Sequence, residues 1–149
     1  MTGLLRAEWH LAYGGMCIPC NWSQAAFVHI LSQYSPLRYS VADARNMVVK
    51  KSIEEGYEWL IFVDHDVILP WDFLVKMNKY MLDKAAPIVG GLYFTKSSPA
   101  EPLIYRGRGN SYFTNWKLGE KVWVDGYGLG CHLIDVKLLK TVWDDSEEY

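Results

Sequence analysis

Hydrophobic and polar positions alternate between strand-like and helix-like patterns along the chain. Short apolar runs at residues 15–19, 58–64, 87–91 and 128–134 have the length and side-chain types of buried strands. Between and after them, apolar stripes with helical spacing predict helices at residues 22–34, 40–55 and 136–142, and another that begins at Pro70. Alternating strands and helices predict an α/β layer structure.

Local signals mark the ends of these helices. Ser40 and Asp43 resemble a capping box in front of the second helix, and Gly56 supplies a C-terminal stop after about Glu55. Pro70 suits the first turn of the third helix, because a helix leaves that N–H unbonded. These signals favour helices rather than loops at both places.

The pattern changes after residue 97. Residues 97–110 contain two prolines and two glycines, which predicts a loop with at most a short strand. Residues 112–116 and 121–125 are predicted to form a hairpin around residues 118–120. We therefore expect one α/β domain over residues 1–149, with a mostly parallel sheet and a small antiparallel hairpin.

The main candidate for chemistry is Asp64-His65-Asp66, which directly follows the predicted strand at residues 58–64. Side chains alternate along a strand, so Asp64 and Asp66 point the same way. Two carboxylates on one face repel each other unless a positive charge lies between them. A hard cation such as Mg²⁺ or Mn²⁺, bridging to a phosphate, would supply that charge. The alternative is a strand-end turn whose two aspartates face water.

Composition limits the partners. A net charge of −2 argues against a nucleic acid polymer, which would require a basic face. No stretch is apolar enough for a transmembrane segment or a signal peptide, so we expect a cytoplasmic protein. The Cys17 and Cys20 pair has redox or zinc spacing, with Cys131 and His132 as the remaining ligands, but buried thiols are the better interpretation.

Four segments carry a family resemblance through their order and spacing. They are Pro19-Cys20-Asn21, Ala44-Arg45-Asn46, Asp64-His65-Asp66 with Pro70, and Val89-Gly90-Gly91, which Gly128-Leu129-Gly130 echoes later. In this order they resemble the GT-A nucleotide-diphospho-sugar transferases, particularly the family-2-like glycosyltransferases. The resemblance implies a GT-A-like, Rossmann-related three-layer sandwich and a UDP- or GDP-sugar donor. It also implies that Asp66 binds Mn²⁺ or Mg²⁺, with Asp64 as its partner.

Further residues are candidates for holding the donor. Arg45 and Asn46 lie near a helix N-terminus, which favours anions, although Arg45 could instead pair with an acidic residue of its own helix. The resemblance places the nucleotide's base and ribose at Pro19 and Asn21. His65, between the two aspartates, is counted with these substrate-binding residues.

Two later residues complete the predicted site. In several members of the resembled family a histidine or carboxylate from this region completes the metal shell, which suggests His132, although a lone histidine is more often simply packed. Asp125 could bind the donor sugar or an acceptor hydroxyl. Trp116, Trp123 and Tyr127 could stack on a sugar acceptor or pack within the hairpin.

The resemblance leaves the acceptor unidentified as saccharide, lipid or protein. Family members usually continue further, so we expect the acceptor-side C-terminal region to be short or missing, and no general base is assigned. Two alternatives stay open: a nucleotidyltransferase, which would normally have a glycine-rich basic loop after the first strand, and a non-catalytic module that binds nucleotide sugars or carbohydrates.

Overall fold

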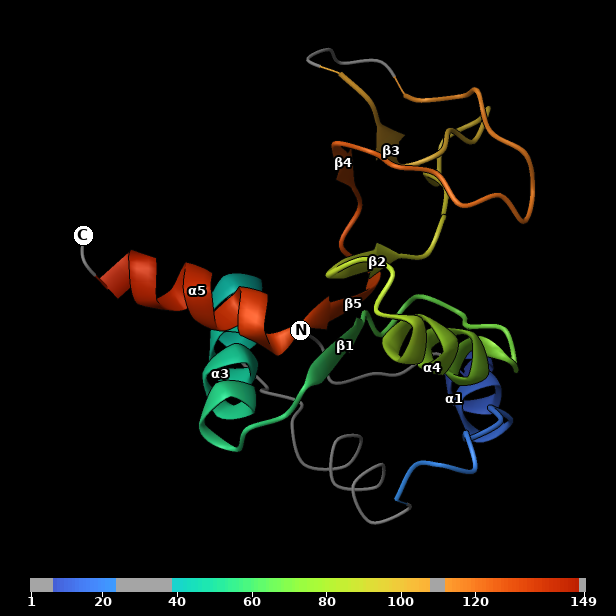
Figure 1. The fold of residues 1–149 in the computed structure, drawn as a ribbon. Helices are drawn as coiled ribbons and strands as arrows, with labels where there is room; N and C mark the ends of the chain where they lie inside the picture. The colour runs from blue at the N-terminus through green and yellow to red at the C-terminus, as the bar shows by residue number, and fades with distance from the viewer. Residues whose placement is uncertain (1–6, 24–38, 108–111, 148–149) are drawn as a thin grey trace.

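The computed structural model describes residues 7–23, 39–107 and 112–147. Two helices come first along these residues, and four strands follow one another between α4 and α5; Figure 1 labels each element. The elements are α1 (Ala7–Gly14), α3 (Val41–Glu54), β1 (Trp59–Val63), α4 (Phe73–Asp83), β2 (Ile88–Gly90), β3 (Ile104–Tyr105), β4 (Gly126–Tyr127), β5 (Cys131–Asp135) and α5 (Val136–Glu147).

All strand pairs among the described residues are antiparallel. The larger sheet has the order β1-β5-β2, with β5 antiparallel to both neighbours, and β3 pairs with β4 in a separate small sheet. The expectation of a mostly parallel sheet in a Rossmann-related, GT-A-like sandwich is therefore wrong. Apolar runs indicate which strands are buried but not their direction, and here the last strand inserts between the first two.

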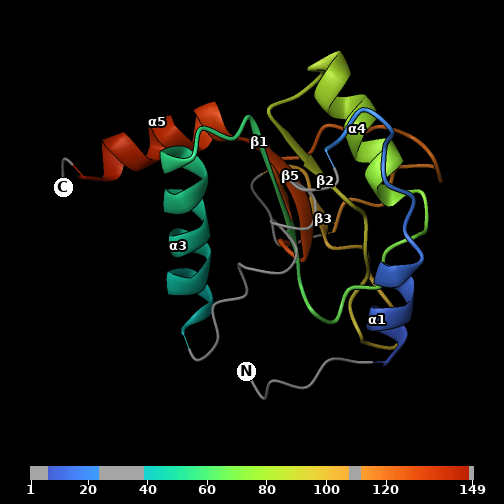
Figure 2. The ribbon, with the colours of Figure 1, turned by 90° about the horizontal axis from the view of Figure 1, so that it is seen from below.

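Helices lie on both sides of the larger sheet. In Figures 1 and 2, α3 and α5 lie on one side and α4 with α1 on the other. Leu133 at the centre of β5 is fully buried and belongs to a core cluster with Leu74 and Met77 of α4. The next residue toward the N-terminus, His132, lies on the opposite face, because side chains alternate along β5.

Several predicted elements are confirmed. Helix α3 begins after Ser40, whose Oγ accepts the Asp43 N–H at 3.1 Å, and Gly56 beyond its end has a φ of +72°. Strand β1 forms where the apolar run predicted it. Helix α4 also forms, but it begins at Phe73 and not at the predicted Pro70, whose carbonyl accepts the Phe73 N–H at 3.0 Å.

The N-terminal region differs from the prediction. Residues 15–19 form no strand; the Cys17 N–H donates instead to the Trp71 carbonyl at 2.8 Å. Helix α1 precedes them and was not predicted, because none of its side chains is buried and its sequence shows no apolar stripe. The helix predicted at residues 22–34 falls almost entirely outside the described residues.

Residues 92–129, called the arm below, leave the sheet after β2 and return just before β5. Figure 1 shows the arm above the β2 edge of the sheet. A hairpin of residues 112–116 and 121–125 was predicted within the arm, and this prediction is wrong. Its turn forms, with the Glu120 N–H donating to the Lys117 carbonyl at 3.0 Å, but its two sides bond to β3 instead. Phe113 donates to the Ile104 carbonyl and Asp125 to the Tyr105 carbonyl.

The arm is fastened to the sheet through tyrosines that lie against glycines. The Tyr93 hydroxyl accepts the Gly130 N–H at 2.7 Å, and a Cβ at Gly128 would collide with the same hydroxyl. A Cβ at Gly90 would likewise collide with the Tyr127 ring. The paired glycines that the sequence presents on both sides of the arm therefore make room for tyrosine side chains.

The C-terminal helix is longer than predicted. Helix α5 continues past residue 142 to Glu147, and Lys140 pairs with Asp144 at 2.6 Å. None of the helices in the described part of the chain is long and apolar enough to cross a membrane.

Candidate functional site

The backbone of Asp64 is held in place at the end of β1. Its N–H donates to the Gly130 carbonyl at 2.7 Å, which extends the β1–β5 pairing by one residue. Its carbonyl accepts the Val67 N–H at 3.1 Å in a tight turn and the Trp9 indole N–H at 3.2 Å. Strand β1 ends at Val63 and Asp66 lies in this turn, so the prediction that strand alternation points Asp64 and Asp66 the same way is wrong.

Arg45 reaches this turn from the second turn of α3. Its guanidinium donates to Asp64 Oδ1 at 2.9 Å and to the Leu129 carbonyl at 3.1 Å, and it lies over the Phe62 ring at 5.8 Å. The capped start of α3 directs the arginine toward the end of β1. Arg45 thus forms an ion pair with Asp64 of Asp64-His65-Asp66. The sequence had left open a different pair, with an acidic residue of its own helix.

Asp66 has its own basic partner, which comes from the arm. Lys96 Nζ lies 3.0 Å from Asp66 Oδ2, and this hydrogen bond lowers the pKa of the Asp66 carboxyl. The Lys96 side chain is 82% exposed. An ion pair so open to water contributes well under about 1 kcal/mol, so Lys96 can leave Asp66 at little cost. His65, between the aspartates, is exposed.

His132 lies beneath the Arg45 and Asp64 pair. Only 3% of it is exposed, and its ring is 5.1 Å from that of Phe62, its partner across β1 and β5. Burial, followed by the charge of Arg45, lowers the pKa of His132 to about 4, so the ring is neutral at pH 7. Its Nδ1 has no hydrogen-bond partner among the described residues.

The predicted metal ligands are only partly brought together. The described residues contain no group of three or more histidine, cysteine, aspartate or glutamate side chains that could hold a metal ion, so His132 does not join the two aspartates. Asp64 and Asp66 alone still suit Mg²⁺ or Mn²⁺, because such ions bind one or two carboxylates and take their other ligands from water and phosphate. The donor chemistry of this pair therefore fits the cation.

The predicted nucleotide-binding residues divide between two places. Asn46 is exposed on α3 beside Arg45. Pro19 is buried, and the Asn21 amide exchanges hydrogen bonds of 3.2 and 3.0 Å with the Asn78 amide of α4. The predicted first strand does not form, and Asn21 lies against α4 and not at the end of β1.

Asp125 has a structural role within the arm. Its carboxylate accepts the Gly107 N–H, and its own N–H donates to the Tyr105 carbonyl at 3.0 Å. The residue thereby fastens the end of β3, and it lines a separate cavity described below.

The three cysteines are free thiols. Cys17 and Cys20 are exposed, so the interpretation of this pair as buried thiols is wrong, whereas Cys131 is buried. Burial, with a smaller contribution from Asp64, raises the pKa of Cys131 to about 12, which keeps this thiol protonated.

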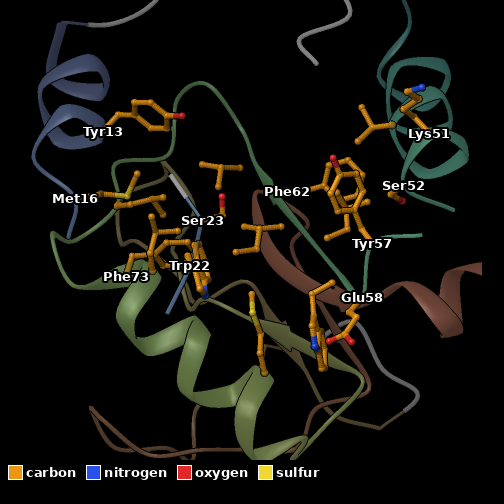
Figure 3. A pocket seen from close by; sticks show the side chains of 18 of the residues that line it. Tyr13, Met16, Trp22, Ser23, Lys51, Ser52, Tyr57, Glu58, Phe62 and Phe73 are labelled. Carbon is orange, nitrogen blue, oxygen red and sulfur yellow. The ribbon is translucent and has the colours of Figure 1, made fainter. Parts of the chain in front are cut away.

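An apolar cavity of about 460 Å³ runs along β1 between α1, α3 and α4. Figure 3 shows Tyr13, Met16 and Phe73 on one side of this cavity and Tyr57 with Ser52 on the other. Trp9, stacked on Tyr13 at 4.8 Å, lines it and also bonds to the Asp64 carbonyl. This indole connects the apolar cavity with the charged end of β1.

No known protein family, curated protein or solved structure matches this chain. The function of the site therefore rests on its own residues.

Three contributors to the site were not predicted from the sequence: Lys96, the Leu129 carbonyl and the Tyr93 hydroxyl. Lys96 lies 30 positions from Asp66 in a segment without periodic hydrophobicity. Only Tyr93 had a signal, since it closely follows Val89-Gly90-Gly91, one of the four segments that carry the resemblance.

Proposed function

We propose that the end of β1 is the donor site of a metal-dependent glycosyltransferase, which moves a sugar from a UDP- or GDP-sugar to an acceptor. One observation supports this most: each aspartate of Asp64-His65-Asp66 faces a basic side chain from a different part of the chain. The site thus offers carboxylates for a cation and cations for a diphosphate within one cluster.

The two ion pairs differ in how easily they can change partner. Arg45 is held by Asp64 and by the Leu129 carbonyl, with 23% of its side chain exposed, so it stays in place as a fixed positive charge. Lys96 has Asp66 as its ion-pair partner and is far more exposed. In the proposed donor complex Lys96 turns from Asp66 to a phosphate oxygen, and Asp66 becomes available to the cation.

Asp64 and Asp66 would hold Mg²⁺ or Mn²⁺, which would offset the charge of the departing nucleoside diphosphate. Arg45 and Lys96 act on the same group, since a guanidinium and an ammonium both stabilise negative charge that builds up on phosphate oxygens. His132, beneath Arg45, stays neutral and so adds no positive charge that would compete with the cation for the two aspartates. We place this activity in the cytoplasm, where the three free thiols would stay reduced.

A non-catalytic nucleotide-sugar-binding module is the second candidate. Transfer needs a base for the acceptor hydroxyl, and no further histidine, cysteine or acidic side chain joins the two aspartates among the described residues. Asp144, near the C-terminal end, pairs with Lys140 on α5. Binding of the donor without its consumption would favour this candidate.

Isothermal titration calorimetry of the full chain with UDP and with GDP, each with and without MnCl₂, tests the proposal. We expect binding of at least one nucleotide that depends on Mn²⁺ and weakens at least about tenfold in Asp66→Asn. Asp72→Asn is the matched control, because Asp72 is also an ion-paired aspartate, 2.8 Å from Lys76 on α4. The proposal fails if neither nucleotide binds, or if both variants lose binding equally.

Product analysis then separates the candidates. With a UDP- or GDP-sugar and Mn²⁺ but no acceptor, a transferase passes the sugar to water and releases nucleoside diphosphate. A nucleotidyltransferase run in reverse with pyrophosphate forms nucleoside triphosphate and sugar phosphate. A binding module leaves the donor intact. Release of nucleoside diphosphate that persists in Asp66→Ala would contradict the role given to Asp66.

A further inference from the structure

A second cavity, of about 790 Å³, lies between the β2 edge of the sheet and the arm. Residues 85–92 line one side, and residues 116–127 of the arm line the other. In Figure 1, β2 and the arm above it lie above α4. A volume of this size is typical of small-molecule sites in proteins, and the donor site described above does not use it.

Aromatic rings form much of its lining. Tyr80, Trp116, Trp123 and Tyr127 all contribute. Trp123 is 70% exposed, so its indole contributes little to the packing of the arm and leaves a flat apolar face open to a ligand. Lys121 Nζ already lies over the Tyr80 ring at 4.6 Å, which leaves the two tryptophans as the platform.

Two of these rings carry polar atoms without a partner. Trp116 Nε1 and the Tyr127 hydroxyl are buried and make no hydrogen bond to any described residue. An unpaired buried donor costs about 1–3 kcal/mol. Burial raises the pKa of Tyr127 to about 12, so its hydroxyl keeps its proton and can donate. Both groups are donors, so they suit a ligand with several oxygen acceptors.

The charged residues of the lining balance one another. Lys117 and Lys121 are matched by Glu120 and Asp125. An anionic ligand such as a nucleotide would meet as much repulsion as attraction there, whereas a neutral polar ligand would find donors and acceptors of both kinds. The electrostatics of the cavity thus differ from those of the Arg45 and Lys96 cluster.

We propose that this cavity binds a neutral, gluco-configured saccharide by stacking on Trp123 and Trp116. Such sugar rings present flat C–H faces for an indole and hydroxyl oxygens for the unpaired donors. Leu129 lines the cavity, and its carbonyl is the one that Arg45 holds beside Asp64. The saccharide therefore lies next to the donor site, and its role as the acceptor, though not its binding, rests on the proposed function.

Calorimetry of the full chain with cellotetraose and with chitotetraose, without nucleotide or metal, tests this site. We expect at least one of them to bind, and Trp123→Ala to weaken that binding by about tenfold or more. Trp116→Phe keeps a ring but removes the N–H, so a smaller loss of about three- to tenfold is expected. Trp71→Ala, which removes a 66% exposed indole outside the cavity, should bind like the wild type.

Absence of binding by both tetrasaccharides would overturn the proposal, and so would equal losses in Trp123→Ala and Trp71→Ala. Trp123→Ala removes an exposed side chain, so the variant should fold, and its melting temperature confirms this before titration. Because no nucleotide or metal is present, the result stands apart from the test of the donor site. Donor binding without saccharide binding would contradict this inference alone.

Discussion

The β1-β5-β2 sheet and the arm are built in different ways. The sheet with its helices contains nearly all buried side chains, including Leu133, and its strands pair over three to five residues. In the described residues of the arm only Pro102 is buried, and β3 and β4 are two residues each. The sheet region is stabilised by its core, whereas the arm depends on single hydrogen bonds and on tyrosines against glycines.

The candidate site draws on both regions. Asp64 and Arg45 belong to the sheet region and are each held by more than one contact. Lys96 belongs to the arm and is mostly exposed. This difference suggests that the fixed part of the site comes from the core and the part that changes partner from the arm.

The largest expected effect is on the core. Leu133→Ala leaves a cavity at the centre of β5 and should lower the free energy of unfolding by about 2–5 kcal/mol, measured by urea denaturation. Leu118→Ala is the control, because Leu118 is 96% exposed in the arm and should change stability by less than about 0.5 kcal/mol. Equal effects would show that the two regions do not differ as described.

The next effect concerns the attachment of the arm. Gly128→Ala places a methyl group against the Tyr93 hydroxyl and should destabilise the protein by about 1–3 kcal/mol in the same assay. Gly14→Ala is the matched control, since a Cβ there meets nothing within 4 Å. If Gly128→Ala is as stable as this control, the close packing of Tyr93 against Gly128, which joins the two ends of the arm, does not contribute to stability.

His132 should make the sheet region sensitive to pH. Its folded pKa of about 4 lies below the unfolded value of 6.5, so the unfolded state binds more protons between these values. Its contribution is complete above about pH 6.5 and is lost as the pH falls. Linkage predicts that the wild type loses about 2 kcal/mol more than His132→Phe between pH 7.5 and 5.0, measured by urea denaturation. Parallel losses in both proteins would contradict the burial of a neutral histidine.

Removing the exposed partner of Asp66 should barely change stability. Lys96→Ala is expected to cost less than about 0.5 kcal/mol, because the ion pair is open to water. The pKa of Asp66 should nevertheless rise toward its ordinary value, which carboxyl NMR titration measures. Lys76→Ala, which removes the partner of Asp72, should leave the Asp66 titration unchanged. An unaltered pKa in Lys96→Ala would rule out the pair.

The sequence predicted the helix and strand features that depend on residues close together in the chain. The capped start of α3 at Ser40 and strand β1 follow from local patterns, and both are confirmed. Helix α4 also forms, but it begins at Phe73 and not at Pro70. Strand direction and the partners of β3 depend on contacts between distant residues, which apolar periodicity does not encode. For the same reason Arg45 and Asp64 were each placed in the site without their mutual ion pair, and Lys96 was missed.

The most direct test of the account is whether Asp64 and Asp66 bind a divalent cation together with a nucleoside diphosphate. Electron paramagnetic resonance reports free Mn²⁺, so the signal of Mn²⁺ with UDP, or with GDP, can be compared with and without the full chain. We predict that the chain removes about one equivalent of free Mn²⁺ beyond the nucleotide alone, and that Asp64→Asn with Asp66→Asn abolishes this loss. A signal that the wild-type chain leaves unchanged with both nucleotides would contradict the account.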